Sequence, residues 1–265
     1  MKNLFASLAL ALVLCPAVAL ARQETRQPAA ARLVEFFDER ILITDIKARL
    51  DNFAIELQQA PDAKGLVVVY AARHKFPGWA GRRAHACLDY LVEGRGLGAA
   101  RVSLINGGPR DETRFEFWLV PAGAVAPPVE PFDLSMLMSG EKTPLPFDRF
   151  DVVERGDTSF SEYGEFYPDA TGLYVYLAEV LRADPSLRAC VIAYTSRRAP
   201  RSTDRRIAAA AKAAIIKSQA VDVRRVVALG GGRRRYKVVE VWLVPPGSPL
   251  PKPTPDAFRT RRGRR

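Results

Sequence analysis

The stretch FEFWLVPAG at residues 115–123 returns as VEVWLVPPG at residues 239–247, 124 residues further along the chain. Each copy has the pattern of an apolar strand that ends at proline and glycine. Sliding the chain along itself by 124 residues, without a gap, places residues 32–123 on 156–247. More than twenty of these 92 positions are identical, whereas chance at ordinary composition gives roughly one in fifteen. The repeated stretch is therefore the closing strand of a duplicated unit.

Within one copy, the hydrophobic pattern changes its period in a fixed order. The run GLVVVYA at 65–71 is continuous and β-branched, as in a central strand buried on both faces. Helical apolar stripes precede and follow this run. Further strands are expected at 33–37, 101–105 and 115–120, and the second copy is expected to have helices near 170–183 and 203–218 and strands near 189–195, 224–229 and 237–244. The predicted fold class is α/β (α+β), with two tandem β-α-β-α-β-β domains, each a small mixed sheet with two helices packed on it.

The first residues of the chain have the pattern of a secretory signal. Lys2 precedes a short apolar run at 4–14, and the small residues Ala19 and Ala21 form a cleavage pattern. The alternative is a retained anchor helix, but the run is too short to span a bilayer comfortably, and no later stretch reaches about 18 apolar residues. We therefore expect an exported protein, periplasmic or extracellular, with no membrane span after cleavage.

Proline-rich stretches mark the ends of the two copies: PAGAVAPPVEP at 121–131 and PPGSPLPKPTP at 245–255. The formal net charge is +11, and residues 252–265 carry six cations against Asp256, a balance of +5. Much of the excess charge therefore lies at the C-terminus. The expected division is a signal peptide at 1–21, a first domain at 32–123, a proline-containing linker at 124–155, a second domain at 156–247 and a disordered proline- and arginine-rich tail at 248–265.

Residues that could carry chemistry are few and are not repeated. The two histidines, His74 and His85, both lie in the first copy, and no His, Cys, Asp or Glu cluster has zinc spacing. Export would leave Cys87 and Cys190, which could form one disulfide or serve as two buried small hydrophobes. The glycines at 94–98 follow a helix, whereas a phosphate cradle precedes one, and those at 107–108 and 230–232 are expected in tight turns. We expect no enzyme, no cofactor and no metal.

Arginines are the polar feature that the copies share. Arg73 and Arg82 flank a loop between the end of a central strand and the start of a helix, where ligands of such sheets usually bind. Two guanidinium groups beside free helix amides would suit a carboxylate or a phosphate. The alternative is that they are solvated or paired with nearby acidic residues. The matched pairs are Arg73 with Arg197, Arg82 with Arg206, Arg101 with Arg225 and Arg110 with Arg234.

The second helix of the first copy, RRAHACLDYLVEGRGLGAARV, resembles the OmpA-like C-terminal domain, a peptidoglycan-binding module of the bacterial envelope. Its matching residues, in order, are Arg83-Ala84, Leu88-Asp89-Tyr90-Leu91, Gly96-Leu97 and Arg101-Val102. The resemblance implies the predicted strand order and a ligand pair, an Asp after the central strand and the Arg that opens the helix. Arg83 falls at that Arg position, but Arg73 and Arg197 stand where the Asp is expected, and Ile207 replaces the helix Arg in the second copy, with Arg206 one residue earlier.

These observations predict a non-enzymatic envelope protein with two degenerate OmpA-like modules. Its expected partner is peptidoglycan or another anionic envelope polymer, and other envelope proteins are a further class of partner; nucleic acid is not expected. The candidate ligand-binding residues are Arg73, Arg82, Arg83, Arg197 and Arg206. The alternatives are a periplasmic interaction scaffold that has lost ligand binding, and a protein that holds anionic polymers through its arginine-rich tail.

Overall fold

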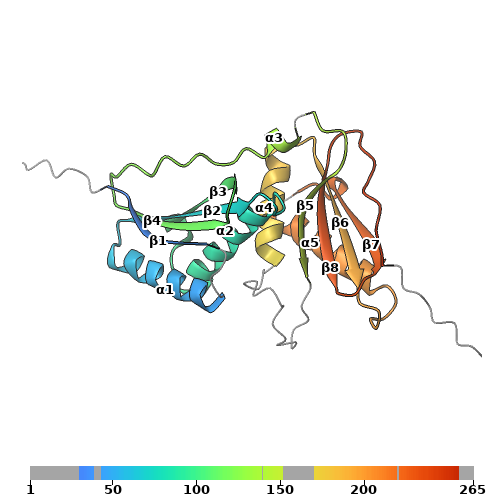
Figure 1. Cartoon of the computed structure of the whole chain (residues 1–265), viewed down its shortest axis with the longest axis horizontal. Coiled ribbons are helices and arrows are strands. Elements are labelled where there is room, and N and C mark those ends of the chain that lie inside the picture. The colour runs from blue at the N-terminus through green and yellow to red at the C-terminus, as the bar shows by residue number, and fades with distance from the viewer. Residues whose placement is uncertain (1–29, 39–42, 139, 152–169, 220, 257–265) are drawn as a thin grey trace, which may run out of the picture.

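The computed structural model describes residues 30–38, 43–138, 140–151, 170–219 and 221–256. They form two α/β units side by side, each with a four-stranded mixed sheet (Figure 1). The strand orders, β1-β4-β2-β3 and β5-β8-β6-β7, are equivalent. In each sheet the central strand pairs parallel with one neighbour and antiparallel with the other. The predicted fold class of two tandem α+β domains is confirmed.

The elements of unit 1 follow the predicted order. The glycines after its second helix end that helix, since Gly96 has a φ of +69° and its amide donates to the Val92 carbonyl. The elements are β1 (Arg32–Asp38), α1 (Ile43–Gln59), β2 (Lys64–Ala72), α2 (Trp79–Asp89), the π-helical turn η1 (Tyr90–Gly94), the 3₁₀ turn η2 (Ala99–Arg101), β3 (Val102–Arg110) and β4 (Arg114–Val120).

The elements of unit 2 repeat this order, and a short helix, α3 (Ser135–Met138), precedes them. They are β5 (Leu145–Asp151), α4 (Ala170–Ala183), β6 (Arg188–Thr195), α5 (Thr203–Gln219), the 3₁₀ turn η3 (Val223–Arg225), β7 (Val226–Arg233) and β8 (Val238–Val244). The first strand of unit 2, β5, lies within the segment predicted as a linker. It begins eleven residues before position 156, where the second domain was expected to begin. The ungapped alignment missed this strand because the spacing between first strand and first helix differs between the copies.

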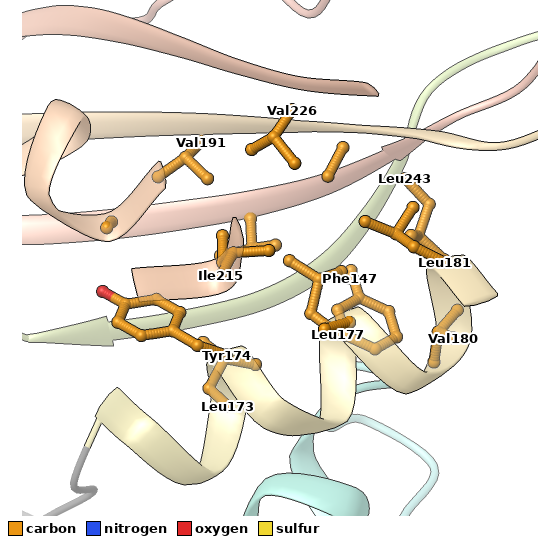
Figure 2. Close-up of a cluster of buried hydrophobic side chains, with 14 of the residues drawn as sticks. Phe147, Leu173, Tyr174, Leu177, Val180, Leu181, Val191, Ile215, Val226 and Leu243 are labelled. Carbon is orange, nitrogen blue, oxygen red and sulfur yellow. The ribbon is translucent and has the colours of Figure 1, made fainter. Parts of the chain in front are cut away.

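The main core of each unit lies between its helices and one face of its sheet. In unit 2, Leu173, Leu177 and Leu181 line one side of α4 and are fully buried against the sheet (Figure 2). Val191 points at this core, whereas Ile192 belongs to a second cluster on the opposite face. The central strands are therefore buried on both faces, as the continuous apolar runs predict.

The outer face of each sheet is covered by the proline-rich segment that follows its last strand. In unit 1, Val129 packs on this face, and the amide of Phe132 donates to the carbonyl of Asn106 (2.8 Å). In unit 2, Leu250 packs on the corresponding cluster, and the amide of Thr254 donates to the Tyr194 hydroxyl (3.0 Å). The segment from Ser248 to Asp256, predicted as disordered, is thus docked on the sheet because the sheet offers it apolar and hydrogen-bonding surface.

Two predicted turns are instead parts of strands. Gly107 and Gly108 lie within β3, and Gly230 to Gly232 lie within β7. A Cβ at Gly107 would come within 2.2 Å of the Tyr70 ring, and one at Gly231 within 2.5 Å of the Tyr194 ring. The glycines are needed for this close approach of a tyrosine to the backbone, and this requirement produced the turn-like sequence signal.

The two units pack through α2 and α4, which lie against each other (Figure 1). Glycines allow the close approach: a Cβ at Gly81 would come within 2.2 Å of the Tyr176 ring, and one at Gly172 within 3.2 Å of the Arg82 carbonyl. The Asn106 amide also donates to the Tyr176 hydroxyl (2.6 Å). The interface is therefore closely packed and includes polar contacts.

Candidate functional site

Arg82, a predicted ligand contact, is buried where unit 2 covers unit 1. Its side chain is 1% exposed, and its Nε donates to Asp148 of β5 at 2.7 Å, whose carboxylate is fully buried. Beside it, the amide of Gly78, just before α2, donates to the carbonyl of Phe147 (2.7 Å). The start of α2, where the arginine pattern predicted a ligand, is thus occupied by a carboxylate and a carbonyl from the second unit.

Arg83 is also withdrawn from solvent. It is 6% exposed, and its guanidinium lies 5.2 Å from the centre of the Trp79 ring. The structure thus places this predicted ligand contact in a buried position. The burial of Arg82 could not be predicted from the sequence, because its partner Asp148 lies in β5, within the segment expected to be a linker.

Two of the four matched arginine pairs have the same structural role in both units. Arg101 donates to three carbonyls at the end of α1, and Arg225 does the same at the end of α4. Arg110 lies over the Tyr70 ring and Arg234 over the Tyr194 ring, at 3.5 and 3.4 Å from the ring centres. These repeated arginines hold the fold together.

Arg73 lies in an open depression at the carboxyl edge of the first sheet, where β1, β2 and β3 end. The depression has a volume of about 520 Å³. The Nε of Arg73 donates to Asp111 at 2.9 Å, and both side chains are largely exposed. The charged residues that line it are Arg73, Arg110 and Arg114 together with Asp38, Asp111 and Glu112, three cations against three acids. This edge of unit 1 therefore has no excess charge.

Arg197 lies in the corresponding depression of unit 2, also about 520 Å³ in volume, which is lined by Ser196, Arg197, Arg198, Arg235 and Asp256. Three guanidinium groups here face one carboxylate, and that carboxylate accepts from the Arg235 amide (2.7 Å). Sequence position 235 corresponds to position 111, so an arginine replaces the acid that neutralises Arg73 in unit 1. The copied site has thereby become basic in unit 2.

The loop that carries Arg197 is held by its neighbours. The guanidinium of Arg233 donates to the carbonyls of Arg197 and Ala199, and Asp204 accepts from the amide of Gly232 (3.0 Å). Arg206, the counterpart of Arg82, is exposed, and its guanidinium donates to the Thr203 hydroxyl at the start of α5 (3.2 Å). The depression is therefore built on a loop with several backbone anchors.

Arg198 and Arg235 were not among the predicted site residues. Sequence identity between the copies points to arginines that occur in both, whereas Arg198 and Arg235 have different counterparts in unit 1, His74 and Asp111. A comparison of charge between the matched loops could have found them. Identity between the copies points to Arg197 alone in this depression, and the differences in charge point to Arg198 and Arg235.

The two cysteines are buried and free, and they lie in different units. Burial raises the pKa of the Cys87 thiol to about 12 and that of Cys190 to about 12. At pH 8 both thiols are therefore almost entirely protonated. We expect iodoacetamide to leave both thiols unmodified in the native protein at pH 8 and to label both in 6 M guanidinium. Labelling of the native protein at a rate near that of free cysteine would contradict this burial.

Within the described residues, no group of three or more His, Cys, Asp or Glu side chains could hold a metal ion. Over the same ranges, no helix has the length and apolar character needed to cross a membrane. The predicted signal peptide lies outside the described residues. No family model matches the chain, and no curated protein shows a significant match to it.

Proposed function

We propose that the protein is a non-enzymatic binding protein of the bacterial envelope that holds an anionic wall polymer, such as peptidoglycan, through unit 2. The observation that carries this proposal is the cluster of Arg197, Arg198 and Arg235 around one depression at the carboxyl edge of the second sheet. Guanidinium groups bind carboxylates and phosphates in a bidentate manner, and both groups occur in wall polymers. The signal-like N-terminus and the OmpA-like sequence pattern support an envelope location.

The role of unit 1 in this proposal is to support unit 2. Its equivalent edge is neutral, and the start of its second helix is occupied by Phe147 and Asp148. This occupation also favours the alternative of an interaction scaffold that has lost ligand binding. The two functions differ in one respect that can be measured, which is whether the protein binds the wall polymer itself.

The test is a pull-down with isolated sacculi, with polyglutamate and polyphosphate as soluble carboxylate and phosphate probes. Arg235→Asp restores the acid found in unit 1 and should weaken binding by about tenfold or more, since it reverses one of three cations in the depression. Asp111→Arg gives unit 1 the arrangement of unit 2 and should strengthen binding. Arg224→Ala removes a cation that lies at the opposite edge of the sheet, with 86% of its side chain exposed, and should have little effect.

Deleting residues 257–265 separates the depression from the arginine-rich end of the chain. Binding that survives this deletion and fails in Arg235→Asp supports the proposal. Binding that is lost with the deletion, while Arg235→Asp behaves like the wild type, would assign polymer binding to the C-terminal arginines instead. No binding to sacculi or to either probe would leave the scaffold as the function.

A further inference from the structure

A second concave surface lies on the outer face of the second sheet, away from the arginine depression. It is a groove of about 580 Å³ between β5, β8, the docked C-terminal segment and the loop before α2. Its lining residues are Phe76, Pro144, Pro146, Asp148, Arg149, Glu240, Trp242, Pro249, Leu250, Pro251, Lys252 and Thr254. Two aromatic rings, four prolines, one leucine and two exposed cations therefore meet in one groove.

The two cations of the groove, Arg149 and Lys252, are the charges that an occupant can meet, because the two acids that line it, Asp148 and Glu240, are already engaged. Asp148 is paired with Arg82, and Glu240 accepts from Arg234 (2.6 Å) and from the Tyr194 hydroxyl (3.1 Å). The side chains of Arg149 and Lys252 are exposed and form no ion pair with a described residue. An occupant of complementary charge is acidic.

The indole of Trp242 differs from its counterpart in unit 1. Trp118 Nε1 donates to Glu116 at 3.1 Å. In unit 2 the corresponding carboxylate, Glu240, is held by Arg234, and Trp242 Nε1 is buried without a hydrogen-bond acceptor among the described residues. A peptide carbonyl placed in the groove would supply the missing acceptor once the neighbouring side chains shift to admit it.

The molecule itself shows which kind of chain this sheet face accepts. Both outer faces already hold an extended proline-rich segment, through Val129 and Phe132 in unit 1 and through Leu250 and Thr254 in unit 2. Aromatic grooves favour proline-rich segments because their extended conformation is formed in advance. The groove runs beside the docked segment on the same face, so a second extended chain can lie next to the first.

We propose that this groove binds an extended, proline-containing acidic peptide segment of another protein. The apolar side chains of the segment lie on Trp242, Phe76 and the prolines, and its carboxylates meet Arg149 and Lys252. The docking is independent of the arginine depression and of polymer binding. It gives the protein a second contact, with a protein partner, at the junction of the two units.

The test uses a panel of eight-residue synthetic peptides, alternating Pro-Glu, Pro-Lys and Gly-Glu, and follows the indole N–H signals of the three tryptophans by NMR. The Trp242→Phe variant assigns the signal. We expect the Pro-Glu peptide to bind and to move the Trp242 signal, with those of Trp79 and Trp118 unchanged. The Pro-Lys peptide should not bind because of its charge, and the Gly-Glu peptide should bind about tenfold more weakly because it lacks the apolar contacts.

Reversing both cations with Arg149→Glu and Lys252→Glu should weaken binding of the Pro-Glu peptide by about tenfold or more. The matched control reverses one arginine and one lysine elsewhere, with Arg224→Glu and Lys217→Glu, and should bind as the wild type does. Equal loss in both double variants, an unmoved Trp242 signal at saturation, or no binding at millimolar peptide would overturn the proposal. Arg235→Asp should leave peptide binding unchanged, so that this test and the polymer test fail independently.

Discussion

Asp148→Ala is expected to destabilise the protein by about 3–5 kcal/mol, because it leaves the charge of Arg82 buried between the units without its counter-ion. The Arg82 side chain is 1% exposed, and Asp148 supplies both of its carboxylate contacts. The Nη1 atom of Arg82 already lacks a hydrogen-bond acceptor. Among the residues that the structure describes, no second acid is paired with this guanidinium to take over from the lost carboxylate.

Urea unfolding followed by tryptophan fluorescence measures this effect. Trp79 and Trp118 report on unit 1 and Trp242 on unit 2, so that a loosened interface would also separate one transition into two. Asp111→Ala is the matched control, since it removes the acid of an exposed Arg–Asp pair, whose loss typically changes stability by at most about 1 kcal/mol. Equal effects of the two variants would contradict a structural role for the buried pair.

Replacing both members of the buried pair distinguishes the cost of an unpaired charge from the value of the pair. Arg82→Met with Asp148→Leu removes both charges while keeping much of the volume. Such replacements are often neutral or stabilising, so we expect the double variant to recover most of the stability lost in Asp148→Ala. If the double variant does not recover this stability, the ion pair is needed to hold the local geometry, including the neighbouring hydrogen bond from the Gly78 amide to the Phe147 carbonyl.

The fold could be predicted from the sequence to a large extent, because the duplication presents the hydrophobic pattern of most helices and strands twice. The helices at 170–183 and 203–218 and the strands around 65–71 and 189–195 are present close to their predicted bounds. What failed was the start of unit 2. Matching residues without a gap placed Phe36 on Phe160, whereas hydrogen-bond register makes β5, at 145–151, the counterpart of β1.

The candidate site was predicted less well, for a physical reason. Identity between copies selects residues that the fold requires, such as Arg101 with Arg225 and Arg110 with Arg234. Packing between the units cannot be predicted from either copy alone, and it buries Arg82 against Asp148. Of the three residues that carry the proposed binding, Arg197 is an arginine in both copies, whereas Arg198 and Arg235 lie where the copies differ in charge.

Arg225→Ala is expected to destabilise unit 2 by about 2–4 kcal/mol, because one guanidinium satisfies the open end of a helix. Its Nη2 donates to the carbonyls of Leu181, Asp184 and Leu187 at 2.6, 2.7 and 2.8 Å. These carbonyls lie at and just beyond the end of α4, where the helix dipole favours a cation. Without the arginine, partly buried acceptors lose their donor.

Arg101→Ala is the same experiment in unit 1, since Arg101 Nη2 donates to Leu57, Ala60 and Ala63 at 2.7, 2.8 and 3.0 Å. Lysine at either position keeps the charge but has no planar fork to reach three carbonyls, so Arg225→Lys should recover less than half of the loss. Arg224→Ala, the neighbouring exposed arginine, should leave the unfolding midpoint unchanged. If Arg225→Lys were fully stable, the charge at the helix end would account for the effect, and the repeated arginine would not be needed for its geometry.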